Sequence, residues 1–209
     1  MLNSKGFDLW ADGYDRDVGL SDEDNLYPFA GYRAVLGRIF DTVMQKSAPA
    51  VLDLGFGTAV LTSKLYERGC RVFGQDFSPR MVEIASEKMP EARLFCGDFT
   101  EGLCRELLEN RYDFIIATYS LHHLTDEEKI PFIKKLLSLL NEGGSILIGD
   151  VAFEDRAALE ACREDCGEGW DDEEYYFAAD ELKADFPSLE FEKCSHCAGV
   201  VRIRKEGCE

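Results

Sequence analysis

The sequence contains no apolar run near the length of about twenty residues that a membrane span needs. It also lacks a basic stretch followed by an apolar one at its start, the pattern of a secretory signal. Internal repeats, low-complexity tracts and long linkers are absent as well. We therefore expect a cytoplasmic protein built as one globular domain, because about two hundred residues are ordinary for a single α/β sheet.

Basic residues are scarce in this chain. Its 209 residues include 41 Asp and Glu against 23 Lys and Arg, a formal net charge of −18. Proteins that bind nucleic acids draw much of their affinity from Lys and Arg side chains that neutralise phosphates. The composition therefore predicts a small-molecule partner and disfavours a nucleic acid.

Eight cysteines and three histidines allow two interpretations. Cys162, Cys166, Cys194 and Cys197 include ligands of the right chemistry for zinc. Alternatively, the cysteines are small apolar side chains in a reducing compartment, and we favour this interpretation because the Cys-x-x-Cys spacing falls at a predicted hairpin turn. We therefore expect no metal site.

A β-α-β unit opens at Ala50. Val51–Leu54 is a short apolar run with one acid inside it, typical of a strand buried on both faces. Gly55 and Gly57 follow at once, where the chain must turn into a helix and where a missing Cβ lets a ligand come close. A helix from 58 to 68 ends at the glycine that follows it, and a second strand then leads to Asp76. This arrangement predicts a nucleotide site.

Two classes of nucleotide use such a unit. The dinucleotide fingerprint needs a small residue in the sixth position, but Val60 stands there, which disfavours an NAD-dependent oxidoreductase. Asp53, two residues before the first glycine, suits a compact cationic ligand better than a pyrophosphate. The block resembles motif I of class I S-adenosylmethionine-dependent methyltransferases, Asp/Glu-x-Gly-x-Gly-x-Gly, with Ala59 in place of the third glycine.

The resemblance continues through most of the chain, from a Trp-Ala-x-x-Tyr-Asp start that contains Tyr14. It implies that Asp76 binds the ribose hydroxyls, that Asp98 faces the adenine amine, and that Phe77 and Phe99 enclose the ring. The same acid, Asp76, can also stabilise the turn before a helix at Ser78. The S-adenosylmethionine site implied by the family comprises Tyr14, Asp53, Gly55, Gly57, Asp76, Phe77, Met81, Gly97, Asp98, Phe99 and Thr118.

The family also implies the fold. We expect a three-layer α/β sandwich with a seven-stranded, mainly parallel sheet of order 3-2-1-4-5-7-6 and an antiparallel strand seven. The pattern predicts strands at 112–118, 146–150, 189–195 and 200–204, and a capping box from Thr125 to Glu128. One domain is divided into an N-terminal lid and helix (1–48), a donor-binding core (49–152), a variable acceptor-side segment (153–187) and a C-terminal hairpin (188–205).

The acceptor side is predicted from two aromatic segments, 7–44 and 153–186. Tyr14 is the preferred lid residue, and an amphipathic helix follows it and ends before Pro49. In the second segment, Trp170–Phe177 is either a solvated acidic loop or a recognition loop for a cationic acceptor. His122 and His123 follow the fourth strand, and His123 is, with Tyr14, a candidate catalytic residue. His122 is better explained as structural.

We therefore expect a methyltransferase, monomeric or homodimeric, that acts on a small-molecule acceptor. The Asn-Pro-Pro-Tyr motif of enzymes that methylate base amines is missing, since Thr118-Tyr-Ser-Leu121 occupies its position. A non-catalytic S-adenosylmethionine-binding regulator is the main alternative. No residue is indicated by the sequence as a certain general base.

Overall fold

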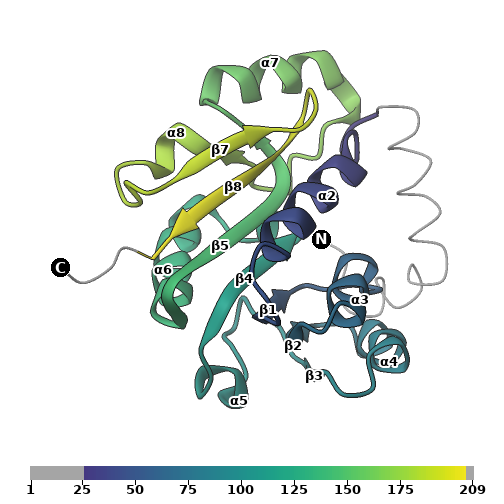
Figure 1. The fold of residues 1–209 in the computed structure, drawn as a ribbon. Helices are drawn as coiled ribbons and strands as arrows, with labels where there is room; N and C mark the ends of the chain where they lie inside the picture. Colours follow the sequence, from purple (N-terminus) through teal and green to yellow (C-terminus); the bar gives the residue numbers. More distant parts are fainter. Residues whose placement is uncertain (1–25, 206–209) are drawn as a thin grey trace.

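The computed structural model describes residues 26–205, and its centre is a sheet with helices on both faces (Figure 1). The main path of the sheet has the order β3-β2-β1-β4-β5-β8-β7, and a short β6 pairs with β5 off this path. The strands are β1 (Ala50–Leu54), β2 (Arg71–Asp76), β3 (Arg93–Cys96), β4 (Tyr112–Thr118), β5 (Leu140–Phe153), β6 (Phe177–Ala178), β7 (Glu190–Lys193) and β8 (Ala198–Arg204).

The predicted order 3-2-1-4-5-7-6 is confirmed once β6 is counted, because this added strand turns predicted strands six and seven into β7 and β8. β8 runs antiparallel to both β5 and β7, and the remaining pairs are parallel. β6 has only two residues, too few to leave a periodic pattern in the sequence.

Helices cover the two faces as separate layers. One face is packed by α2, α3, α4 and α7 and the other by α5, α6 and α8, so the sheet has two hydrophobic cores. The helices are α2 (Tyr32–Val43), α3 (Val60–Glu67), α4 (Pro79–Lys88), α5 (Arg105–Leu108), α6 (Asp126–Ser138), α7 (Arg156–Cys166) and α8 (Ala179–Leu182), with 3-10 turns η1 (Leu121–His123) and η2 (Gly167–Gly169). Within residues 26–205, no helix has both the length and the apolar character to cross a membrane.

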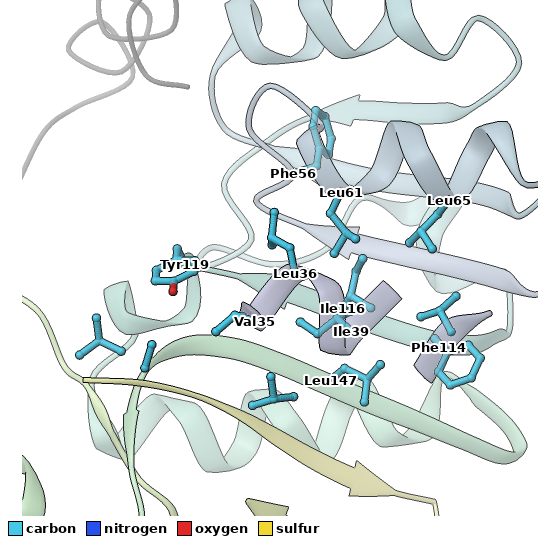
Figure 2. Packing of buried hydrophobic residues seen from close by; sticks show 14 of the residues in the cluster. Val35, Leu36, Ile39, Phe56, Leu61, Leu65, Phe114, Ile116, Tyr119 and Leu147 are labelled. Atoms are coloured by element: carbon cyan, nitrogen blue, oxygen red, sulfur yellow. The ribbon is translucent and has the colours of Figure 1, made fainter. Parts of the chain in front are cut away.

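Strand alternation divides the side chains between the two cores. Leu147 of β5 belongs to the core beneath α2, whereas its neighbours Ile146 and Ile148 belong to the opposite core. Figure 2 shows Val35 and Ile39 of α2 in the same core as Leu147. α2 can lie close to the sheet because β5 has a glycine at 149, where an added Cβ would come within 2.3 Å of Val35.

Several boundaries differ from the predicted ones. α3 begins at Val60 and not at 58, because Ala59 has a left-handed conformation (φ 61°) that a helix cannot include. β5 begins at Leu140 and not at 146, and its pairing with β4 contains a register shift, because Leu140 pairs with Tyr112 and Ser145 with Phe114. α8 has only four residues, Ala179–Leu182. The capping box of α6 between Thr125 and Glu128 is confirmed.

Candidate active site

A cavity of about 390 Å³ opens at the carboxyl ends of the parallel strands. Ligands of open α/β sheets bind at this edge, because the loops that follow neighbouring strands meet there. The cavity is lined by Tyr32, Leu36, Asp53, Gly55, Phe56, Gly57, Thr58, Val60, Leu61, Thr62, Asp76, Phe77, Met81, Asp98, Phe99, Thr100, Thr118, Tyr119, Ser120, His123, Thr125, Glu128 and Tyr175.

The glycine loop after β1 forms one side of the cavity. Gly55 has φ +71°, and a Cβ there would come within 2.5 Å of the Cβ of Ser120. Ser120 in turn donates a 2.8 Å hydrogen bond to the carbonyl of Leu54, which holds the ends of β1 and β4 together. Gly57 also has a positive φ, of +53°, but an added Cβ would meet nothing within 4 Å. Gly55 is therefore required for packing, whereas Gly57 supplies only the turn.

Asp53 places a buried carboxylate beneath this loop. It is 1% exposed, and its Oδ2 accepts a hydrogen bond from the hydroxyl of Thr62. Its Oδ1 has no hydrogen-bond partner within the described part of the chain. Burial raises the pKa of Asp53 to about 7, the Thr62 bond opposes this shift, and the charge of Asp76 adds to it. An unpartnered carboxylate oxygen at a cavity wall suits a ligand that brings a positive charge or an N–H donor.

Asp76 joins two loops at the end of β2. Its Oδ2 accepts a 2.8 Å hydrogen bond from the backbone N–H of Gly57, and its Oδ1 accepts one of 3.0 Å from that of Ser78. The hydroxyl of Ser78 then caps α4 by accepting from the N–H of Met81. Asp76 thus supports the turn before α4 and lines the cavity as well.

The far end of the cavity lies beyond β3. Asp98 is exposed, and its Oδ1 accepts hydrogen bonds from both the backbone N–H and the hydroxyl of Thr100, at 2.8 and 2.7 Å. Phe99 is buried and packs against Phe132 of α6, with ring centroids 5.8 Å apart. Phe77 is half-buried and lines the same cavity, so aromatic rings and carboxylates lie together in this part of it.

Tyr119 shapes the opposite wall. It has φ +51°, an uncommon conformation for a bulky residue, and its ring packs against Phe29 and Tyr32 at centroid distances of 5.4 and 5.3 Å. Its hydroxyl is buried without a hydrogen-bond partner among the described residues. Nothing in the local sequence distinguished this tyrosine, and its left-handed backbone is apparent only from the structure.

The two histidines after β4 have different surroundings. His123 lines the cavity, and burial together with the neighbouring His122 lowers its pKa to about 4, so its imidazole is neutral near pH 7. His122 is buried, with Nδ1 2.6 Å from Asp150 Oδ1 and Nε2 3.1 Å from Glu174 Oε2. Burial alone would lower the pKa of His122, but Asp150 and Glu174 outweigh it and raise the value.

The aromatic residues that precede α2 contact the segment that follows α7. Tyr27 stacks on Trp170 with ring centroids 5.1 Å apart, and its hydroxyl is hydrogen-bonded to that of Tyr176. Lys129 of α6 is almost fully buried and donates to the carbonyl of Tyr175. The two segments that were predicted to form the acceptor side each supply a tyrosine to the cavity, Tyr32 and Tyr175.

The ionisable lining is acidic. Asp53, Asp76, Asp98 and Glu128 line the cavity with His123, and the described lining contains no Lys or Arg. This acidic lining attracts cations and repels anions.

Most of the predicted site residues lie together. The cavity lining includes the predicted Asp53, Gly55, Gly57, Asp76, Phe77, Met81, Asp98, Phe99, Thr118 and His123. Gly97 is not part of this lining, and it lies against Gln75, whose amide nitrogen would lie 3.3 Å from an added Cβ. Tyr14 lies outside the described residues.

The zinc site that we weighed for the cysteines is not formed within residues 26–205. The sulfur atoms of Cys162 and Cys166 lie 4.0 Å apart on α7. The group of described side chains close enough to hold a metal ion contains no cysteine. Cys197 is buried in the hydrophobic core, in agreement with the alternative that treats cysteines as apolar filling.

Comparisons with known proteins agree with this fold. Residues 51–144 match a methyltransferase domain family. An uncharacterized methyltransferase of Anoxybacillus flavithermus is 41% identical, and the match covers 74% of this chain and 70% of the relative. An uncharacterized methyltransferase of Geobacillus kaustophilus is 39% identical, and the match covers 86% of this chain and 84% of the relative. The magnesium protoporphyrin IX methyltransferase of Synechocystis PCC 6803, solved with bound SAH, has a TM-score of 0.66 at 18% identity and covers 85% of each chain. Sequence and fold together show that this chain belongs to the class I S-adenosylmethionine-dependent methyltransferases.

Proposed function

We propose that this protein transfers the methyl group of S-adenosylmethionine to a small-molecule acceptor that carries no net negative charge. The observation that supports this most strongly is the unpartnered Oδ1 of the buried Asp53 in a cavity whose described lining holds acids and no Lys or Arg. S-adenosylmethionine has a sulfonium and an ammonium group, so its positive charge complements this surface.

The proposed donor orientation follows the strand ends. The methionine part would lie by the glycine loop, where Asp53 Oδ1 can accept from the ammonium group. The ribose would face Asp76 at the end of β2, and the adenine would lie between Phe77 and Phe99 with its amine toward Asp98. One carboxylate each for the ammonium group, the ribose and the adenine amine would fix the position of the donor along the cavity.

The acceptor is proposed to bind at the aromatic wall formed by Tyr32, Tyr119 and Tyr175. Methyl transfer from a sulfonium needs little covalent assistance, because the leaving group is already activated. The protein would act mainly by holding the nucleophile in line with the methyl group and by excluding water. A base matters only if the acceptor must lose a proton, and the low pKa of His123 makes it a weak base for that step.

Titration calorimetry with S-adenosylmethionine, S-adenosylhomocysteine and NAD tests the donor site. We expect binding of the first two and none of NAD. Tighter binding of NAD than of S-adenosylhomocysteine would overturn the assignment of this cavity as a methyl-donor site.

A non-catalytic S-adenosylmethionine sensor is distinguished by the release of S-adenosylhomocysteine. We expect this release with a panel of neutral and amine-bearing acceptors, and a weaker response to carboxylate or phosphate acceptors of similar size. Donor binding without release for any acceptor class would favour the sensor. A preference for anionic acceptors would contradict the proposed acceptor charge.

A further inference from the structure

Two histidines and a glutamate meet beside the cavity. His122 and His123 lie in η1, and Glu174 lies far along the chain, in the loop before β6. One possible ligand atom from each of the three side chains falls within 4.8 Å of the others. Two imidazoles and a carboxylate form a donor set that zinc and other first-row divalent metals use in proteins.

The imidazole of His122 is already oriented by a second carboxylate. Its Nδ1 lies 2.6 Å from Oδ1 of Asp150, a fully buried residue at the end region of β5. The same Oδ1 accepts a 2.8 Å hydrogen bond from the N–H of Val151, so its position is fixed by the backbone. Nε2 of His122 is thereby turned toward Glu174, at 3.1 Å from Oε2. Metal-binding histidines usually have this arrangement, with the second ring nitrogen bonded to a carboxylate.

The loop that carries Glu174 is held on both sides. The N–H of Tyr175 donates a 2.9 Å hydrogen bond to the carbonyl of His122. The carbonyl of Tyr175 accepts a hydrogen bond from the buried ammonium of Lys129. These bonds fix the backbone beside Glu174 against η1, while the Glu174 side chain stays 24% exposed, which leaves a path for an ion.

The charge of the cluster favours a cation. Asp150 and Glu174 both contact a single imidazole, and Oδ2 of Asp150 is buried without a hydrogen-bond partner among the described residues. Buried carboxylates are costly unless a positive charge compensates them. A divalent ion bound beside them would offset both negative charges.

We propose that His122, His123 and Glu174 bind one divalent first-row transition-metal ion, with Asp150 as the outer carboxylate that orients His122. Three protein ligands leave a further coordination position open. His123 also lines the cavity, so the ion would lie at its wall. The sequence does not indicate this cluster, because Glu174 is far along the chain from His122 and His123.

Cobalt(II) added to the full-length, donor-free protein tests this site, because its absorption spectrum separates nitrogen and oxygen ligands from thiolates. We expect one ion per chain, with a spectrum free of thiolate charge-transfer bands. Glu174→Gln and His123→Ala should weaken binding by more than about 100-fold, and Asp150→Asn by about 10- to 100-fold. The exposed His196 provides the matched control, since His196→Ala should leave affinity unchanged.

Glu174→Gln is the decisive variant, because a partly exposed loop side chain can change without loss of the fold; circular dichroism of each variant verifies this. Absence of stoichiometric binding, a thiolate spectrum, or equal affinity in wild type and Glu174→Gln would each overturn the site and leave a structural Asp150–His122–Glu174 network. None of these measurements needs donor or acceptor, so failure here is distinct from failure of the proposed methyl transfer.

Discussion

The carboxylate of Asp76 accepts a 2.8 Å hydrogen bond from the backbone N–H of Gly57, which ties the end of β2 to the glycine loop after β1. Its second oxygen accepts from Ser78 in the turn before α4. One side chain therefore organises two loops that border the cavity. Its substitution must affect the fold as well as any ligand bound there.

We expect Asp76→Ala to lower both donor affinity and stability. If Asp76 accepts the ribose hydroxyls as proposed, its loss costs about 2–4 kcal/mol of binding, or about thirty- to several-hundred-fold in affinity. Two backbone N–H groups also lose their acceptor, so the free energy of unfolding should fall by about 1–3 kcal/mol. Calorimetry and urea unfolding measure the two quantities.

Asp98→Ala is the control, because Asp98 is exposed and bonds only to nearby Thr100 among the contacts described. The free energy of unfolding of this variant should change little. Unchanged affinity in Asp76→Ala would remove Asp76 from the donor site.

Asp53→Asn should stabilise the donor-free protein at alkaline pH and weaken donor binding. Burial raises the pKa of Asp53 from 3.8 to about 7, so the folded state binds this proton more tightly than the unfolded state. The favourable contribution of Asp53 is therefore fully present below pH 3.8 and is lost as the pH rises to about 7.

At pH 8 the asparagine variant should be more stable than wild type by roughly 2–4 kcal/mol, and the difference should shrink toward pH 4. Thermal unfolding across this pH range measures it. A variant that is less stable than wild type at pH 8 would contradict a buried, unpartnered carboxylate at this position.

Gly55→Ala and Gly57→Ala form a matched pair. Both glycines have positive φ, so an alanine at either site costs about 1–2 kcal/mol of backbone strain. Only at Gly55 would the new Cβ also collide with Ser120, which adds about 1–3 kcal/mol. Urea unfolding should therefore show a larger loss for Gly55→Ala. Equal losses at the two positions would disprove the close contact between the glycine loop and the end of β4.

Tyr27→Phe should loosen the contact between the two acceptor-side segments. The variant keeps the stack on Trp170 but loses the hydroxyl, which accepts from the N–H of Asp171 and bonds to Tyr176. We expect the free energy of unfolding to fall by about 1–2 kcal/mol and amide hydrogen exchange in residues 170–177 to become faster. Tyr66→Phe is the comparison, because its hydroxyl accepts one long bond of 3.3 Å at an exposed site. Unaltered exchange in residues 170–177 would show that the hydroxyl does not hold the segments together.

The part of the cavity at the strand ends was predictable, because each of its acidic residues lies beside a strand that the local sequence indicates. Asp53 and Asp76 lie within the last two residues of β1 and β2, and Asp98 follows β3; parallel strands bring those ends to one edge of the sheet. Gly97, next to Asp98, lies outside this lining and against Gln75, a contact that the sequence does not indicate.

The contacts between the residues before α2 and the segment after α7 were less predictable, because they join residues far apart in the chain. The stack of Tyr27 on Trp170 and the bond from Lys129 to Tyr175 have no local signature. The sequence identified both segments as aromatic but could not indicate which rings meet. A buried lysine within an apparently solvated helix face is likewise visible only from the packing.

The acidic lining of the cavity affects the release of S-adenosylhomocysteine, the product formed from the methyl donor. S-adenosylmethionine enters as a sulfonium cation, whereas S-adenosylhomocysteine leaves as a neutral thioether. The described lining contains acids and no Lys or Arg, so part of the attraction that holds the donor disappears at the moment of transfer. S-adenosylhomocysteine should therefore be a weaker inhibitor of this protein than its close structural similarity to S-adenosylmethionine would suggest.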